Sequence, residues 1–350
     1  MQAITAWFKR YFSDPQIVFL ALFLVFVFGI VLTMGDMLAP VLASIVIAYL
    51  LEGIVHLLEL RSFPRLPAVI IVFILFLLFV ALVVLGLLPL LSRQVTEFVQ
   101  QLPAMISMGQ SALMQLPEKY PEIIPQEQVD QLIGQIRNEI GTFGQQVLSW
   151  SLSSVVGVIT LGVYLILMPL LVFFFLKDKR LIIDWVVQYL PKHRKFAGTV
   201  WQDVDRQIGN YVRGKFWEII IIWSVSFSTF SLLGLNYALL LGVMVGLSVI
   251  IPYIGAAVVT IPVLFVAWFQ WGWASDFIWL AVAYFIIQAL DGNVLVPLLF
   301  SEVVNLHPVA IIVAILVFGG FWGFWGVFFA IPLATLVQAV LTAWPKVDST

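Results

Sequence analysis

The sequence predicts an all-α, polytopic integral membrane protein with about eight transmembrane helices. Hydrophobic residues make up 62% of the 350 positions and charged residues only 10%, whereas about a quarter of the residues of a typical soluble domain are charged. Uncharged apolar runs of the length that a helix needs to cross a bilayer, about 20 residues, recur along the chain. Basic and non-basic loops alternate between these runs, as loops on opposite sides of a membrane do. The surface is therefore expected to face lipid.

The composition also excludes several classes of function. A formal net charge of −2 argues against a nucleic-acid partner, which requires a basic face. The chain has no cysteine, and His56, His193 and His307 are far apart in sequence, so neither thiol chemistry nor a metal-ligand cluster is predicted. No G-x-S-x-G, H-E-x-x-H or P-loop motif occurs. We therefore expect no enzyme activity, no cofactor and no metal.

The N-terminal membrane region, residues 1–92, is predicted to hold three spans. Residues 15–33 are uncharged and begin with a proline, which is favoured in the first turn of a helix. Residues 37–58 follow a short Met-Gly-Asp turn, and residues 66–92 are uncharged between two arginines. The N-terminal segment before the first span lacks a small-residue cleavage site, so we expect it to be a retained cytoplasmic leader.

The orientation follows from the distribution of Lys and Arg between the loops. Lys9 and Arg10 precede the first span. Residues 93–150 carry three basic and six acidic residues, whereas residues 177–215 carry nine basic and four acidic residues. The N-terminus is therefore predicted to be cytoplasmic, residues 93–150 extracytoplasmic, residues 151–176 the fourth span and residues 177–215 a cytoplasmic basic amphipathic linker.

The extracytoplasmic segment, residues 93–150, is predicted to be a helical hairpin. Apolar residues recur at alternating steps of three and four in each arm, which is the narrow stripe of a two-helix seam or coiled coil. The three prolines between the arms favour a stiff turn. The hairpin is either an assembly or gating element, which makes a homo-oligomer an expected partner, or simply a self-packed pair of helices. The stripe of the first arm consists of Val99, Leu102, Ile106, Gly109, Leu113 and Leu116.

The C-terminal membrane region, residues 216–345, precedes a short tail, residues 346–350. Proline and glycine divide it into short helical pieces, predicted at residues 216–234, 237–250, 254–271 and 277–290, with two more before residue 345.

Two segments of this region share a layout and form a suggestive internal repeat. Each has a short apolar helix, a Gly/Pro-rich break, a small apolar run and Ile-Pro, and Leu235 matches Leu306. Paired interruptions of this kind indicate a transport site, because irregular backbone at membrane depth is tolerated only inside protein or along a wet cavity. The alternative is that the glycines merely allow close helix packing. The candidate helix breaks are Pro252, Gly255, Pro262, Pro297, Gly319, Gly320, Gly323, Gly326 and Pro332.

Polar residues gather between the two segments, at residues 288–308, in otherwise apolar surroundings. A carboxylate at membrane depth is costly and by default indicates function, so Asp291 is a candidate ion or proton site. The alternative is that Asp291 lies at the cytoplasmic mouth, in an ordinary Asp-Gly-Asn turn. The candidate residues for a transport pathway or ion site are Asp291, Asn293, Gln288, Glu302, Glu218 and Tyr253.

At these residues the sequence closely resembles the autoinducer-2 exporter (AI-2E) family. The resemblance is carried by PYIG at 252–255, by the run from Asp291 to Pro308 and by the Gly/Trp-rich run at 319–335. It extends to LAPVL–AYLLE at 38–52 and FFFLKDK at 173–179, and so covers nearly the whole chain. The family's motif positions correspond here to Pro252, Tyr253, Gly255, Asp291, Asn293, Pro297, Glu302 and Pro308.

The resemblance implies a multi-pass protein of the bacterial inner membrane with about eight spans. It also implies an inner-membrane permease, a secondary transporter that exports a small polar metabolite such as autoinducer-2, either by ion coupling or by facilitated diffusion. Some family members are sodium/proton antiporters, so antiport is the alternative. A structural or regulatory membrane protein that does not transport is the third reading. The expected partners are membrane lipid and a small-molecule or ion substrate.

Overall fold

The structure is a computed structural model that describes residues 15–115, 131, 133–134, 154–188, 195–252, 254–300 and 306–343. The described residues are helical with short connections and contain no strand, which confirms the predicted all-α class. The α-helices are α2 (Pro15–Leu60), α3 (Arg65–Leu82), α4 (Leu88–Met114), α7 (Ser154–Lys177), α8 (Lys179–Val187), α9 (Lys195–Leu232), α10 (Ala238–Ser248), α11 (Ile254–Trp271), α12 (Ser275–Leu290), α13 (Val296–Phe300), α14 (Pro308–Phe328) and α15 (Ala330–Ala343), and the π-helices are η1 (Val83–Leu87) and η2 (Asp291–Leu295).

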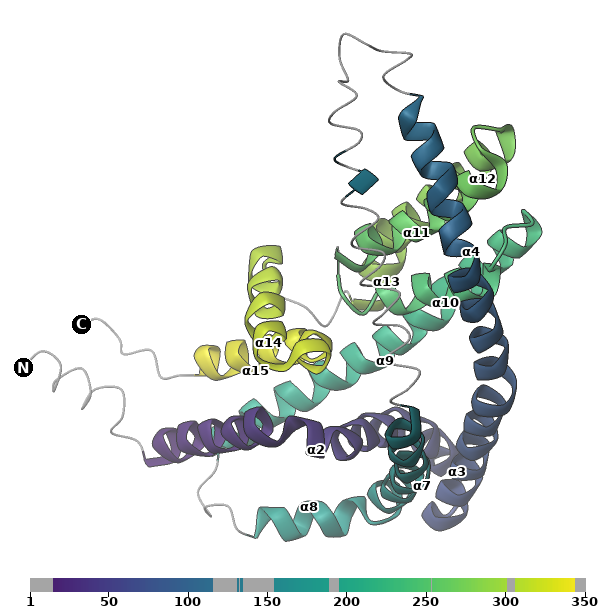
Figure 1. The fold of residues 1–350 in the computed structure, drawn as a ribbon. Coiled ribbons are helices and arrows are strands. Elements are labelled where there is room, and N and C mark those ends of the chain that lie inside the picture. Colours follow the sequence, from purple (N-terminus) through teal and green to yellow (C-terminus); the bar gives the residue numbers. More distant parts are fainter. Residues whose placement is uncertain are drawn as a thin grey trace, which may run out of the picture.

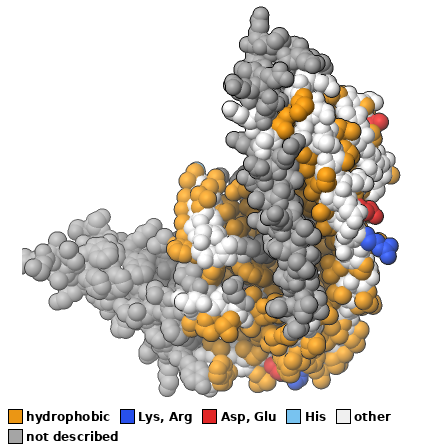
Figure 2. Space-filling view, in the orientation of Figure 1, with side chains coloured by type: hydrophobic (Ala, Val, Ile, Leu, Met, Phe, Trp, Pro, Cys, Tyr) orange, Lys and Arg blue, Asp and Glu red, His pale blue; other side chains and the backbone are white. Residues whose placement is uncertain are grey.

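Within the described residues, four helical stretches are long and apolar enough to cross a membrane: Met37–Leu60, Arg65–Ser111, Ile254–Trp271 and Ser275–Phe300. Shorter apolar helices occupy Gly162–Lys177, Ala238–Ser248 and Val309–Gly323. Figure 2 shows hydrophobic side chains spread over the described surface of this face, with only isolated charged ones. The predicted total of about eight spans stays a prediction.

The N-terminal helices differ from the predicted separate spans at one point. The expected turn between the first two spans is a kink inside α2, where Met34 has φ −121° and ψ 16°. α2, α3 and α7 then pack around a shared apolar cluster that includes Val55, Val69 and Val172. Arg65 closes the end of this bundle, because its guanidinium donates to the Leu176 carbonyl at 2.8 Å. The same guanidinium also pairs with Glu52 and Glu59.

The stretch Arg65–Ser111 is 47 residues long, and at 1.5 Å per residue it reaches roughly 70 Å, more than twice the bilayer core. Its continuation, α4, packs against α10, where Phe98 and Tyr237 meet edge to face at 5.5 Å and Met105 is buried. The stripe predicted for the first hairpin arm is partly buried in α4 from Val99 to Leu113. Leu116 and nearly all of the second arm lie outside the described residues, so the hairpin stays a prediction.

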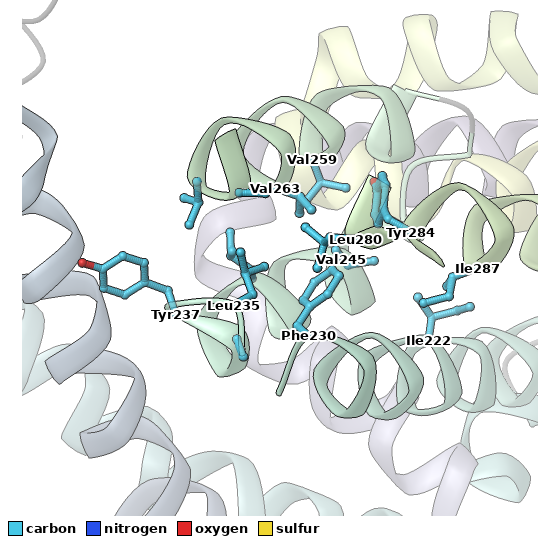
Figure 3. Packing of buried hydrophobic residues seen from close by; sticks show 14 of the residues in the cluster. Ile222, Phe230, Leu235, Tyr237, Val245, Val259, Val263, Leu280, Tyr284 and Ile287 are labelled. Atoms are coloured by element: carbon cyan, nitrogen blue, oxygen red, sulfur yellow. The ribbon is translucent and has the colours of Figure 1, made fainter. Parts of the chain in front are cut away.

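The long helix α9 organises the second half of the chain. It crosses the centre of Figure 1 and packs against α2, α10, α12, α13 and α15. From Lys195 onward, the predicted linker and the following span are one continuous helix, because no Pro interrupts Lys195–Leu232. An apolar core forms where α9 faces α10, α11 and α12 (Figure 3). It is centred on residues such as Phe230, Val245, Val263 and Leu280, all fully buried.

Both π-helices end two residues before a proline. η1 ends at Leu87 before Pro89, and η2 ends at Leu295 before Pro297. A proline inside a helix has no N–H to donate, and its ring clashes with the carbonyl four residues earlier. Widening the preceding turn into a π-helix accommodates this clash without ending the helix, and such π-bulges are frequent at functional sites. The sequence analysis predicted a helix break at Pro297. In the structure the helix continues through this residue.

A further predicted break, at Pro262, is also wrong, whereas Pro332 follows directly after the interruption between α14 and α15. Pro262 lies inside α11, which continues to Trp271. Pro332 is the third residue of α15, where the N–H that proline lacks would have no helical partner in any case. Gly319 and Gly320 were also predicted as breaks, but they lie within the helical part of α14. The break comes at Gly323, with φ 55° and ψ −131°.

The two remaining interruptions have the same construction, which supports the internal repeat. After α10 the chain turns at Ile251 and Pro252 and restarts as α11. In the second segment the helix is interrupted at Gly323 and resumes to Phe328, and α15 begins after a turn at Phe329. A Cβ atom on Gly255 would collide with the carbonyl oxygen of Ser248, and one on Gly326 with that of Phe318. These two glycines are 71 positions apart, the same offset as Leu235 and Leu306. Each lets the returning backbone lie directly on the helix before it.

Replacing Gly326 by alanine is expected to destabilise the protein, because the added Cβ forces the backbone of the second turn apart. Overpacking of this kind costs about 1–3 kcal/mol. The measurement is the midpoint of thermal denaturation of the purified protein in detergent. The matched control is Gly320→Ala in the same helix, where a Cβ meets no atom within 4 Å and where alanine favours helix by about 1 kcal/mol. Equal midpoints for the two variants would contradict the close approach.

Candidate functional site

A buried ion pair lies on α9 beside the first helix break. Lys215 and Glu218 are one helical turn apart, and their side chains are only 6% and 2% exposed. The Lys215 ammonium forms an ion pair with Glu218 Oε2 at 2.6 Å and donates a hydrogen bond of 2.7 Å to the carbonyl oxygen of Val249. Val249 is the residue at which α10 ends. The lysine therefore ties a charged pair to a carbonyl that the interruption leaves without a helical donor.

Asp291 completes the charged cluster from the opposite side. It is the first residue of η2, and its Oδ1 atom is buried without a hydrogen-bond partner among the described residues. Asp291 interacts electrostatically with both members of the pair, attracted by Lys215 and repelled by Glu218. Lys215 thus pairs directly with Glu218, and Asp291 is a second carboxylate within its electrostatic range. A buried polar atom without a partner is rare and calls for an explanation, such as a bound ion or a proton.

An aromatic wall closes the cluster where α13 meets α9. The Phe300 ring lies 5.3 Å from the Lys215 ammonium, within cation–π range, and 5.7 Å from the Tyr211 ring. Gly214 allows this contact, because a Cβ there would come within 2.8 Å of the Phe300 ring and 3.3 Å of the Leu299 carbonyl oxygen. The second interrupted hairpin, formed by α14 and α15, reaches the same part of α9, since Ile331 of α15 packs into one cluster with Tyr211. Both interrupted segments therefore converge on residues 211–218 of α9.

A second polar layer lies between α9 and α12, on the other side of an apolar level from the charged cluster. The Tyr284 hydroxyl is 2.9 Å from Thr260 Oγ1 and also hydrogen-bonds Gln288. On the α9 side, Ser226 is fully buried. Between this layer and the charged cluster, Ile222 of α9 and Ile287 of α12 lie side by side in the apolar core (Figure 3). The facing surfaces of α9 and α12 thus alternate between charged, apolar and hydroxyl-bearing levels.

The structure brings together some of the predicted site residues and separates others. Asp291 and Glu218 lie in the same cluster, and Gln288 lies in the adjacent polar layer. Asn293 is exposed, and its amide donates to the Ala289 carbonyl of its own helix at 2.8 Å. His307 accepts a hydrogen bond from the backbone N–H of Val309 and so caps α14. Two predicted residues, Tyr253 and Glu302, lie outside the described residues.

Sequence reasoning missed Lys215, Phe300, Ser226 and Tyr284. The signal for Lys215 was present, because it stands three positions before Glu218 at the start of a long uncharged run, and i,i+3 residues are neighbours on a helix. Counting Lys215 among the basic residues of a cytoplasmic loop concealed that relation. Phe300, Ser226 and Tyr284 carried no comparable local signal.

A separate polar contact joins the N-terminal bundle to the same helix. The Tyr49 hydroxyl of α2 donates to the Asp205 carboxylate at 3.1 Å, and the Arg213 guanidinium lies 6.0 Å above the Tyr49 ring. Arg213 also donates to Asn210 at 3.0 Å. Gly209 allows the approach, since a Cβ there would overlap the tyrosine ring. α9 is therefore held by polar contacts on two faces, one to α2 and one to the charged cluster.

The comparison with known proteins agrees with this architecture. The family model for AI-2E family transporters matches residues 17–346. The chain belongs to the AI-2E transporter family. The Escherichia coli K12 protein PerM, which is named as a permease, is 46% identical over 345 residues, covering 99% of this chain and 98% of PerM. The Bacillus subtilis protein YueF, named as a transport protein, is 28% identical over 331 residues, covering 92% of this chain and 88% of YueF. This AI-2E family member is accordingly an integral membrane protein related to transporters.

Removing either charge of the buried pair is expected to destabilise the protein strongly. Lys215→Met leaves both carboxylates of the cluster without a cation, and Glu218→Gln removes the carboxylate that pairs directly with Lys215; breaking a buried pair in this way typically costs about 3–5 kcal/mol. The double variant should lose much less than the sum of the two, because it leaves neither charge of the pair alone. The four proteins form a double-mutant cycle, which is measured by comparing their denaturation midpoints in detergent.

The control for this cycle is the partly exposed pair Lys177 and Asp178, whose side chains are 41% and 26% exposed and whose charged atoms are 3.6 Å apart. Surface pairs contribute little, so Lys177→Met and Asp178→Asn should barely move the midpoint. Strictly additive losses at positions 215 and 218 would contradict the coupling.

Proposed function

We propose that this protein is a secondary transporter in which Lys215, Glu218 and Asp291 form an ion-coupling site. The observation that carries the proposal is the hydrogen bond of 2.7 Å from Lys215 to the Val249 carbonyl at the helix break, next to two carboxylates. Intramembrane charges of this kind typically mark ion and substrate pathways. Interrupted helices in membrane transporters likewise form substrate and ion sites.

The proposed coupling follows from the charge balance of the cluster. With all three groups ionised, two carboxylates face one ammonium and the cluster carries one excess negative charge. Binding a proton or a monovalent cation removes that excess, and the low polarity of the surroundings makes such interactions strong. The strength of the ion pair between Lys215 and Glu218, and of the hydrogen bond from Lys215 to the Val249 carbonyl, then changes with the net charge of the cluster. A change at the ion site is thereby transmitted to the turn between α10 and α11.

The apolar level of Ile222 and Ile287 supplies a barrier in this scheme. It separates the charged cluster from the layer of Tyr284 and Thr260, and an apolar constriction opposes the passage of water and ions. Movement of the α10–α11 turn relative to α9 would open the cluster toward one side at a time. We further propose, from the Lys/Arg bias of the loops, that the N-terminus is cytoplasmic and, from the family resemblance, that the protein lies in the bacterial inner membrane.

The proposed substrate is a small polar metabolite such as autoinducer-2. Its export would be driven by an ion that moves down its own gradient. The family name supports this choice. Sodium/proton antiport is the second candidate, and the purely ionic make-up of Lys215, Glu218 and Asp291 favours it. The two functions differ in one observable. An antiporter exchanges the ions without any metabolite, whereas a coupled exporter moves ions only when its metabolite is present.

Asp291→Asn is expected to reduce gradient-driven flux at least tenfold, because an amide cannot take up and release a proton and binds a cation less well. The assay uses purified protein in liposomes with an imposed sodium or proton gradient, a trapped pH dye and autoinducer-2 inside or omitted.

The matched control for this flux assay is Asp276→Asn. This exposed aspartate lies in the first turn of α12, the helix that leads into η2 and Asp291, and its replacement should leave the flux unchanged. Wild-type flux in Asp291→Asn at every pH would reject the ion site. Wild-type liposomes that move neither ions nor autoinducer-2 would favour a structural or regulatory protein.

A further inference from the structure

The short helix α8 leaves the end of α7 as a separate surface element. α7 ends at Lys177, Asp178 interrupts the helix with φ −103° and ψ 17°, and α8 begins at Lys179. In Figure 1 it runs away from α7, below α2. One anchor fixes its start, since the Lys179 ammonium pairs with Glu52 of α2 at 3.1 Å. The beginning of α8 is therefore held against the bundle, and the rest extends from it.

Three apolar side chains of α8, those of Leu181, Ile183 and Val186, are exposed. None of its nine residues is buried, and Leu181, Ile183 and Val186 are 69%, 47% and 42% exposed. The polar residues Arg180 and Asp184 are four positions apart and share one face, while apolar residues occupy most of the remainder. A helix this short is not stable alone in water. Its folded form implies an apolar surface beneath it.

The surroundings of α8 indicate that the lipid bilayer covers its apolar side. The preceding helix α7 exposes Ile166, Leu170 and Phe174, as a lipid-facing span does, and α8 continues directly from its end. Three basic residues lie at that junction: Lys177 and Lys179 pair with Asp178 and Glu52, and Arg180 is exposed. Basic residues beside a span are attracted to anionic headgroups, by about 1 kcal/mol each. An amphipathic helix with this composition lies in the plane of the membrane interface.

We infer that α8 is an interfacial anchor whose apolar side lies among anionic phospholipids at the membrane surface, with Asp184 turned toward water. This binding surface is independent of the ion-coupling site and would exist in a transporter and in a non-transporting protein alike. It gives the protein a contact with one leaflet only, at the end of α7. It also fixes the height of α7, and through Glu52 that of α2, relative to the headgroups.

The absence of cysteine from the chain makes a direct test possible. Ile183→Cys is labelled with an environment-sensitive fluorophore in the purified full-length protein and reconstituted in vesicles of phosphatidylcholine with phosphatidylglycerol. The matched variant is Asp184→Cys, one position further on. Two quenchers are compared: an aqueous iodide ion and a nitroxide attached to the lipid near the headgroup.

At position 183 we expect a blue-shifted emission, protection from iodide of at least threefold relative to position 184, and strong quenching by the nitroxide lipid. Equal iodide quenching at both positions would overturn the inference, because α8 would then be in water. Protection from iodide without quenching by the lipid nitroxide would also overturn it, because protein would then cover the helix.

The headgroup preference is tested on the same labelled protein. Replacing phosphatidylglycerol by phosphatidylcholine alone should increase the iodide quenching at position 183, and the added substitution Arg180→Gln should weaken the dependence on anionic lipid. A position-183 signal that is indifferent to headgroup charge in both proteins would contradict the assignment of anionic lipid as the partner.

Discussion

The fold of the second half depends on keeping Lys215 partnered while it is buried. Removing an ammonium group from water is costly unless its donors are satisfied, and here the partners come from different places. Glu218 lies one turn along α9, the Val249 carbonyl belongs to the first helix break, and the Phe300 ring covers the remaining side. Meeting this requirement brings α9, the end of α10 and α13 to one point. The interruption of the membrane helix and the buried charge therefore stabilise each other.

The two interrupted hairpins make this arrangement quasi-symmetric. Gly255 and Gly326 each bring a returning backbone onto the carbonyl of the preceding helix, and both hairpins pack against α9. Only one of the two turns carries the charged cluster, since Ile331 of the second meets Tyr211 in an apolar contact. One hairpin is thus linked to an electrostatic site and the other to an apolar one. On the far face, Tyr49 ties α9 to the N-terminal bundle through Asp205, so α9 can transmit a change between the two halves.

The sequence predicted the helices where apolar length decides them, and erred where neighbouring elements do. Residues 254–271 were predicted as a helix and coincide with α11, because glycine and proline bound an uninterrupted apolar run there. Pro262 and Pro297 were predicted as breaks, but helices in membranes accommodate proline through local π-turns and neighbouring groups. Glu218 and Asp291 were identified as candidates from their rarity in apolar surroundings. Lys215, Phe300 and Tyr284 depend on which helices meet, and a single sequence does not contain that information.

The proposed ion-coupling site of Lys215, Glu218 and Asp291 requires that ions reach Asp291, and this is tested most directly by thiol accessibility in the otherwise cysteine-free chain. Asp291→Cys is expected to react in liposomes with a small cationic thiol reagent but not with a maleimide attached to a bulky polymer. Ile222→Cys, in the apolar level, should react with neither. Unreactive Asp291→Cys would mean that the turn is packed dry, and equal reaction with both reagents would place it in bulk water. Either result would contradict the account.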